Sequence, residues 1–326
     1  MKLQRKLAVA IVSAAAAVAV LAAATLSASA AGTKPKVVFV AGQVGIPFYT
    51  SVQCGAQDAA KKYAVDLKWT GSTDWDISKE MPFINAAMQL KPKAIIFSPT
   101  DSTALVPVAK QMSKKGIFPI TVDAPLAKPV DVANFQSNHF AGGVAAAKAM
   151  IKLTGGKGTY LDVDLKPGLP DIGARTRGFV TTMKARGAKV LPIAYPGTDS
   201  SKAAAMVSAA IRAHSDLTGV YVTHSAAAQG ASAAIKQAGK QGKIKLIAFD
   251  ADPQQITDLK RGVYDALVVQ EPYQMGWQSV KLAGQLARGQ VKPSQVNEEH
   301  LLPFFVVTRS NVNNPKVKQN FYKASC

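Results

Sequence analysis

The sequence predicts an α/β protein made of two doubly wound lobes, each a parallel sheet with helices on both faces. Short apolar runs rich in Val, Ile and Phe alternate with helical patterns beyond residue 35, as buried parallel strands require. The 326 residues exceed one typical core and suit two lobes of roughly 100–200 residues each. Hydrophobic residues make up 48% and charged residues 18%, which favours a globular fold over disorder.

The first β-α series occupies roughly the first third of the chain after the N-terminal segment. Its predicted strands are Lys36–Gln43, Leu67–Gly71, Ala94–Ser98 and Pro119–Ala124. Its predicted helices are Phe48–Ala64, Ile77–Leu90 and Thr103–Lys115. Crossovers between parallel strands are expected to be right-handed.

The same rhythm then restarts, which implies a second lobe. Its predicted strands are Thr159–Val163, Val190–Tyr195, Gly219–Thr223, Lys245–Asp250, Asp265–Gln270 and Phe304–Thr308. Its predicted helices are Asn138–Leu153, Ile172–Arg186, Lys202–Ala213, Ala226–Ala238 and Gln254–Arg261, and a further helix, Pro272–Arg288, follows this second unit. The last of these helices needs a sheet to cover and could return to the first lobe, so that the chain crosses between lobes more than once.

The N-terminal segment has the pattern of a signal peptide, assigned here to residues 1–31. A basic start (Lys2, Arg5, Lys6) precedes the apolar run Leu7–Leu26, and small residues allow cleavage after Ala30 or Ala31. The alternative is an uncleaved membrane anchor, since the run is about long enough to span a bilayer. No Cys precedes Cys54, which excludes a lipoprotein. We expect an exported protein, periplasmic or extracellular, with tethering through an uncleaved segment left open.

The formal net charge is +19, and removing Lys2, Arg5 and Lys6 leaves +16. The Lys residues are scattered and form no basic cluster interleaved with aromatics, so we expect no nucleic-acid partner. The two cysteines, Cys54 and Cys326, suggest one disulfide in an exported chain, and two unpaired thiols are the alternative. A disulfide at the last residue would hold a tail that otherwise frays.

Ligands of open α/β sheets bind beyond the carboxyl ends of the strands, so the polar residues there are the candidate site. The set is Gln43, Phe48, Tyr49, Asp123, Asp162, Asp164, Asp171, Arg175, His224, Asp250, Asp252, Gln270 and Glu271. Carboxylates accept from paired hydroxyls, Arg and Gln donate to hydroxyl oxygens, and aromatic faces cover a sugar's C–H face. This mixture suits a neutral polyhydroxylated ligand, whereas an anion would require more cations.

Several of these residues also have a purely structural interpretation. Asp252 precedes Pro253 and resembles a helix cap, and Phe48 with Tyr49 could be core at a helix start. His224 could be a satisfied polar residue at a strand end. Trp75 either packs under a loop or flanks the cleft.

Signatures of enzymes are weak in this sequence. It has no Gly-x-Ser-x-Gly elbow and no phosphate loop, and His214 and His224 lack the spacing of a zinc helix. No activated nucleophile stands beside a base. We therefore expect no enzyme, no cofactor and no metal site.

Four stretches carry a resemblance to a known family. They are Gly45–Tyr49; Ser98–Asp101 followed by Pro119–Asp123; Arg175–Phe179; and Ile247–Asp250 with Val269–Gln270. In this order and spacing, the chain from about Pro35 to Val312 resembles the periplasmic sugar-binding proteins of the ribose/galactose type, which are the type I solute-binding proteins of ABC importers.

The resemblance implies roles for individual residues. Phe48 and Tyr49 resemble the stacking aromatics of the family. The residues that resemble its polar clamp, with Asp171 as in galactose-binding members, are Asp123, Asp171, Arg175, Asp250 and Gln270. His224 stands where the family commonly has Asn, Ala124 where ribose binders carry Arg, and Thr198 where a second aromatic is frequent. Gln43, Trp75 and Thr198 are candidates for the cleft wall.

The resemblance also implies two lobes joined by three crossover strands. The expected first lobe is residues 34–136 plus 271–302, the second is 137–270 plus 303–315, and 316–326 is a C-terminal tail. The expected function is reception of a sugar, sugar alcohol or related polyol for an ABC permease, by a monomer that closes around its ligand. The alternatives are a receptor feeding chemotaxis or a histidine kinase, and a non-sugar polar solute.

Overall fold

The computed structural model of the protein describes residues 33–326, and its compact part is Pro35–Cys326. The predicted signal peptide, its cleavage site and the alternative of an anchor lie outside the described residues. Within residues 33–326, no helix has both the length and the apolar character needed to cross a membrane.

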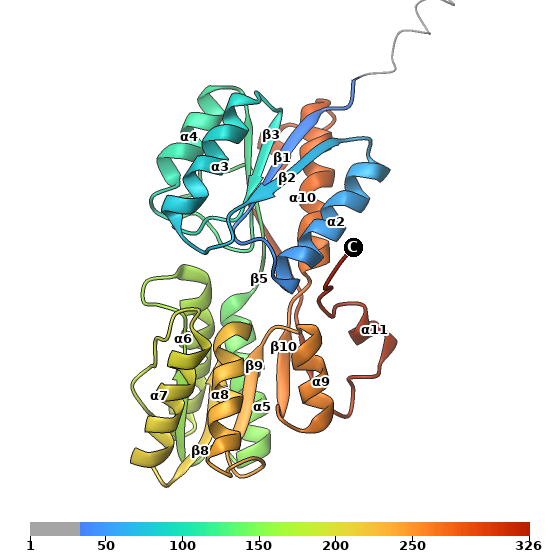
Figure 1. Ribbon diagram of the computed structural model, residues 1–326. Coiled ribbons are helices and arrows are strands. Elements are labelled where there is room, and N and C mark those ends of the chain that lie inside the picture. Colours follow the sequence, from blue (N-terminus) through green and yellow to red (C-terminus); the bar gives the residue numbers. More distant parts are fainter. Residues whose placement is uncertain (1–32) are drawn as a thin grey trace, which may run out of the picture. The chain divides into compact units, whose positions relative to one another are not determined.

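Two six-stranded sheets organise the chain (Figure 1). The first has the order β11-β5-β4-β3-β1-β2 and is parallel throughout. Its strands are β1 (Lys36–Ala41), β2 (Asp66–Gly71), β3 (Ala94–Phe97), β4 (Phe118–Val122), β5 (Ala133–Ser137) and β11 (Glu299–Leu302). The predicted class of two parallel-sheet α/β lobes is confirmed.

The second sheet has the order β12-β10-β9-β8-β6-β7. It is parallel except for β12, which runs antiparallel to β10 at one edge. Its strands are β6 (Thr159–Val163), β7 (Lys189–Val190), β8 (Leu217–Val222), β9 (Lys245–Phe249), β10 (Ala266–Val269) and β12 (Phe305–Val307).

Helices cover both faces of each sheet because alternate strand residues point to opposite sides. On the first sheet, α2 (Pro47–Lys62) and α10 (Pro272–Ala287) pack side by side on one face, and α3 (Ile77–Gln89) with α4 (Val106–Lys114) covers the other (Figure 1). On the second sheet, one face carries α5 (His139–Thr154) and α6 (Pro170–Ala185). The opposite face carries α7 (Ser200–Ala213), α8 (Ser225–Gln237) and α9 (Pro253–Arg261).

The chain passes between the two lobes at three places. It leaves the first sheet after β5, returns after β10 and leaves again after β11. The helix α10, far along the sequence, therefore packs on the first sheet beside α2, as the sequence suggested. After β12 the chain ends in the short helix α11 (Pro315–Lys318) and a tail to Cys326.

One predicted strand is largely absent. The sequence predicted a strand over Val190–Tyr195, but β7 ends at Val190 and only an isolated bridge joins Val163 to Ala194. Pro192 has no N–H to give to the ladder, and β7 is an edge strand, where such an interruption is tolerated.

Helices α5 and α6 approach closely enough that their backbones touch. A Cβ on Gly143 would lie 1.9 Å from the carbonyl oxygen of Arg175, and one on Gly178 would lie 2.2 Å from that of Phe140. No side chain fits at either position. This contact brings the start of α5, with His139, next to Arg175 of α6.

Candidate functional site

A cavity of about 290 Å³ lies at the carboxyl ends of the strands of both sheets. It is lined by twelve of the candidate residues, which are Gln43, Phe48, Tyr49, Trp75, Asp123, Asp171, Arg175, Thr198, His224, Asp250, Asp252 and Gln270. Its volume is near the lower end of ordinary small-molecule pockets, about 300–1,000 Å³. The site therefore suits a ligand of few heavy atoms.

Two aspartates occupy equivalent places in the two lobes. Asp123 follows β4 and Asp250 follows β9, and both have left-handed backbones, with φ of 72° and 79°. The backbone N–H of each donates to the next strand, to the carbonyls of Phe135 and Val268 respectively. An unusual backbone conformation at two strand ends of one cavity is typical of a functional site. It aims both carboxylates at the cavity.

Asp123 is held by the hydroxyl of Tyr49, which donates to its Oδ2 at 2.9 Å. Burial, and then the charge of Asp171, raise the pKa of Asp123 to about 7. Burial also raises the pKa of Asp171. Oxygens of the two carboxyls lie within 4.8 Å of each other, so the two groups titrate as a pair.

Arg175 is the cation that faces these carboxylates, and its side chain is 3% exposed. Its Nη1 donates to the carbonyl of Thr223 at 2.8 Å, and its Nε donates to Nδ1 of His139 at 3.2 Å. The guanidinium lies over the ring of Phe249, 4.2 Å from the centroid. These three contacts hold the guanidinium in place before any ligand binds. Its remaining N–H groups are therefore already oriented for a ligand.

His139 is a neutral support for Arg175. Its Nδ1 accepts from Arg175, so the proton is on Nε2, which lies 3.3 Å from the carbonyl oxygen of Asp123. Burial, and then the charge of Arg175, lower the pKa of His139 well below its usual value. Asp123, His139 and Asp171 cluster as metal ligands would, but both nitrogens of His139 are engaged and Arg175 supplies the positive charge. The cluster is therefore a hydrogen-bonded network around a guanidinium.

Asp250 anchors the second lobe's half of the cavity. Its Oδ2 accepts from the backbone N–H of Ser225 at 3.0 Å. Its Oδ1 accepts from Nε2 of Gln270 at 3.2 Å and from the hydroxyl of Tyr322 at 3.0 Å. The amide nitrogen of Gln270 is thus hydrogen-bonded, whereas its amide oxygen has no hydrogen-bond partner.

Four buried polar atoms of the cavity residues have no hydrogen-bond partner. They are Oδ1 of Asp171, Oε1 of Gln270, Nε1 of Trp75 and Nε2 of His224. The first two accept and the indole N–H donates. Nδ1 of His224 accepts from the N–H of Ala227, so its Nε2 carries the proton and donates. Burial, and then the charge of Arg175, lower the pKa of His224 to about 3, which keeps the ring neutral.

Aromatic side chains wall the cavity on the first-lobe side. The ring of Phe48 packs edge-on against Tyr49 at 5.1 Å, and Tyr49 stacks on Trp75 at 6.2 Å. Gly42 makes room for them, because a Cβ there would lie 2.4 Å from the Trp75 ring and 2.9 Å from the Tyr49 hydroxyl. Trp75 therefore flanks the cavity, which decides between its two interpretations from the sequence.

The structure adds residues that the sequence did not select. Ile46, Leu165, Ile172, Ser225 and Ala226 also line the cavity. Asp252, interpreted as a helix cap, begins α9 and lines the cavity as well. His139 and Tyr322 act from behind it, and no sequence pattern marks either as part of a site. Three candidates from the sequence do not line the cavity: Asp162 and Asp164 are buried elsewhere, and Glu271 is the N-cap residue of α10.

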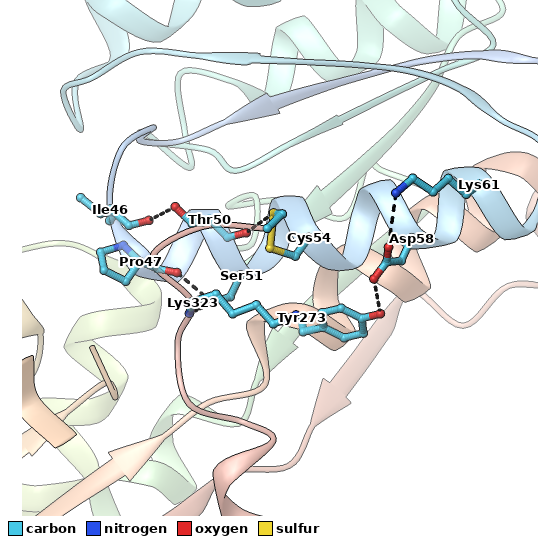
Figure 2. The surroundings of a disulfide bond; sticks show 10 residues. Ile46, Pro47, Thr50, Ser51, Cys54, Asp58, Lys61, Tyr273 and Lys323 are labelled. Atoms are coloured by element: carbon cyan, nitrogen blue, oxygen red, sulfur yellow. Dashed lines mark hydrogen bonds and ion pairs between the residues drawn. A yellow bond between two sulfur atoms is a disulfide. The ribbon is translucent and has the colours of Figure 1, made fainter. Parts of the chain in front are cut away.

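The predicted disulfide is present. Cys54 of α2 is bonded to Cys326 across 272 residues of sequence, with Cα atoms 5.3 Å apart (Figure 2). The tail is thereby attached to the first lobe, although it leaves the second lobe at β12.

Known proteins share this architecture. Ribose import binding protein RbsB of Salmonella typhimurium is 27% identical over 257 residues, which cover 79% of this chain and 86% of that protein. An ABC transporter solute-binding protein from Agrobacterium vitis, solved with bound alpha-D-tagatopyranose, superposes with a TM-score of 0.85 at 28% identity, covering 89% of this chain and 100% of that one. A second protein of that organism, with bound D-fucose, gives 0.82 at 28% identity, covering 88% and 100%.

The model of the periplasmic binding protein domain matches residues 37–290, which include every residue that lines the cavity and all strands of the two sheets except β11 and β12. The chain belongs to the periplasmic binding protein domain family, whose members include the solute receptors of sugar ABC transporters.

Proposed function

We propose that the protein is an extracytoplasmic receptor that binds a neutral sugar, sugar alcohol or related small polyol in this cavity and delivers it to an ABC permease. The observation that carries the proposal is the set of four unpartnered buried polar atoms, two donors and two acceptors, beside an aromatic wall. Unpaired buried polar groups are costly, and a ligand that alternates hydroxyl donors and acceptors would satisfy them.

The residues would divide the work by chemistry. Asp123, Asp171 and Asp250 would accept from hydroxyls, and Arg175 would donate to ring or hydroxyl oxygens. The rings of Phe48 and Trp75 would cover the C–H face of the ligand. Similar proteins that bind ribose, tagatopyranose and D-fucose support the ligand class.

The absence of a second cation near the carboxylates argues against an anionic ligand. Arg175 is the single Lys or Arg among the described residues that line the cavity, and four aspartates line the cavity as well. An anionic ligand would therefore place a further negative charge beside these carboxylates in a desolvated site. Repulsion between buried like charges would weaken its binding by on the order of several kcal/mol. Small neutral polyols meet no such penalty.

The remaining features of the proposal concern the whole chain. We propose that the protein is a monomer that is exported and whose signal peptide is cleaved after Ala30 or Ala31. We propose further that it carries neither a lipid nor a metal, and that it binds its ligand without converting it. Light scattering of the purified protein and the intact mass of exported material test these features. A bound sugar recovered unchanged after long incubation is the expected result, and a modified product would contradict the receptor function.

A panel of sugars and polyols tests the ligand class by thermal shift, followed by calorimetry on the best compound. At a ligand concentration a hundredfold above Kd, linkage stabilises the protein by roughly 2.7 kcal/mol. No shift with any polyhydroxylated compound, together with a shift from an amino acid or nucleoside, would contradict the ligand class. Uptake into vesicles holding the cognate permease separates transport from a sensory role.

Two substitutions test the cavity itself. We expect Asp123→Ala and Arg175→Ala each to weaken binding tenfold or more, about 1.5–3 kcal/mol for a hydrogen bond to a charged group. The matched control is Arg177→Ala, since Arg177 lies on the same helix with its side chain exposed. Unchanged affinity in both cavity variants would refute the site.

A further inference from the structure

The C-terminal tail crosses from the second lobe to the first within a few residues. It starts on the second lobe, where Val312 and Val317 are buried and the N–H of Tyr322 donates to the carbonyl of Ala251. The next N–H, that of Lys323, donates to Oγ of Ser51 in α2, at 2.7 Å (Figure 2). Three residues further on, Cys326 is bonded to Cys54.

Tyr322 stands at the crossing and contacts both halves of the cavity from behind. Its hydroxyl donates to Oδ1 of Asp250 at 3.0 Å, and its ring packs edge-on against Phe48 with centroids 5.5 Å apart. Its side chain is buried, at 4% exposure. Of the three groups that donate to Asp250, Tyr322 is the one that comes from outside the strand ends of the second sheet.

The hydrogen bonds form a chain that ends at an unpartnered cavity atom. Tyr322 and the Gln270 amide share one oxygen of Asp250, and this fixes the carboxylate plane. The engaged nitrogen of Gln270 in turn leaves its Oε1 unpartnered toward the cavity. Loss of the Tyr322 hydroxyl would leave the Gln270 amide as the one donor to Oδ1 of Asp250 among these bonds, so the carboxylate and the amide would be held less firmly.

Few contacts other than the disulfide hold the end of the tail. Residues 323–326 are all exposed, and the contacts of Lys323 are its bond to Ser51 and a position 4.9 Å from the centroid of the Tyr273 ring. Exposed chain ends fray unless they are attached. Cys326 is exposed, whereas Cys54 in α2 is buried, so a reductant can reach the bond from the tail side.

We propose that the tail is a working part of the ligand site, in which Tyr322 is a positioning residue for Asp250 and the Cys54–Cys326 disulfide holds Tyr322 in place, so that ligand affinity depends on the redox state of this bond. The effect on affinity rests on the sugar-binding function proposed above. The positioning of Asp250 by the tail does not, because it is a property of the ligand-free protein.

Four proteins test the coupling by calorimetry with the best sugar of the panel: wild type, Tyr322→Phe, Cys326→Ser and the double variant. We expect Tyr322→Phe to weaken binding roughly tenfold, at the lower end for a hydrogen bond to a charged group because the contact is indirect. Cys326→Ser and reduced wild type should weaken it by the same factor as each other, and Cys326→Ser should not respond to reductant.

The double variant decides whether the bond acts through the tyrosine. If it does, the double variant binds no more weakly than Tyr322→Phe alone, whereas independent effects would multiply. The control is Tyr273→Phe, whose hydroxyl donates to Asp58 on α2 and lies outside the cavity lining. Multiplying effects, or a Tyr322→Phe variant that binds like Tyr273→Phe, would overturn the proposal.

Amide hydrogen exchange without ligand separates this inference from the proposed function. The N–H of Ser225, bonded to Asp250, should exchange faster in Tyr322→Phe and in Cys326→Ser than in Tyr273→Phe. Faster exchange together with no sugar binding by any protein would refute the proposed function and support the positioning role. Unchanged exchange would refute the positioning role whatever the ligand is.

Discussion

Ligand affinity should depend on pH through the facing carboxyls of Asp123 and Asp171. Burial and mutual repulsion raise the pKa of Asp123 to about 7 in the ligand-free protein. A ligand hydroxyl that donates to the carboxylate favours its charged form, so binding releases a proton wherever the pair is still protonated. Affinity must therefore rise as the pH rises through 7.

The size of the effect follows from the ionised fraction. With a pKa of about 7, the ionised fraction is roughly 1% at pH 5 and roughly 90% at pH 8. If the ligand binds the ionised form, its affinity falls roughly ninetyfold between pH 8 and pH 5, which is about 2.7 kcal/mol. Near pH 7, binding should release about half a proton.

Calorimetry at pH 5, 6, 7 and 8, in two buffers of different ionisation enthalpy at pH 7, measures both quantities. The substitution Asp123→Asn removes one titrating partner and keeps the shape, so it should bind more weakly at pH 8 and lose most of the slope. Arg177→Ala should retain the wild-type profile. An affinity that is flat from pH 5 to 8, with no dependence on buffer, would refute the role of the ionised pair.

Two further predictions concern the scaffold. Burial raises the pKa of Glu80 from 4.5 to about 7. The protonated carboxyl therefore stabilises the fold at low pH, and this contribution is lost as the pH rises from about 4.5 to about 7. Because Gln is neutral at every pH, Glu80→Gln should add about 3 kcal/mol to the free energy of unfolding at pH 8 and little at pH 4. Urea unfolding at both pH values checks this, and an equal gain at both would contradict it. Gly143→Ala should separate α5 from α6, cost about 1–3 kcal/mol of stability and weaken sugar binding through Arg175. Wild-type affinity in a destabilised Gly143→Ala protein would show that the helix contact does not position the guanidinium.

The fold class could be predicted from the sequence because it depends on local patterns of apolar and polar residues. Alternation of apolar strands and amphipathic helices identified nine of the twelve strands, with boundaries shifted by at most three residues, but it did not identify β5. The prediction over Val190–Tyr195 was wrong, because the apolar character of Leu191 and Ile193 outweighed the missing N–H of Pro192. Strand β11 lacked an apolar signal, with Glu299 and His300 at its start.

The residues that line the cavity could be predicted from the sequence where they lie at the ends of predicted strands. Asp123 and Asp250 directly follow strands, and His224 lies two residues after the end of β8. Arg175 was selected from a family motif and from the loop that precedes it. No comparable signal identifies His139, which reaches Arg175 only because two glycines let α5 and α6 touch. Asp252 shows the same limit, since a cap and a cavity residue have one sequence signature.

Local periodicity in the sequence was enough to predict the two-lobed α/β organisation and the strand ends at which the candidate residues lie. Counting cysteines only suggested a disulfide, and the structure established the bond between Cys54 and Cys326. Tertiary structure decided which polar atoms are already satisfied and which remain unpartnered for a ligand, as the contrast between Nε2 and Oε1 of Gln270 shows. It also decided that Tyr322, 72 residues from Asp250 in sequence, completes that carboxylate's shell. Hydrogen bonds between segments far apart in the sequence depend on how helices and strands pack against each other. A local sequence pattern therefore cannot predict them.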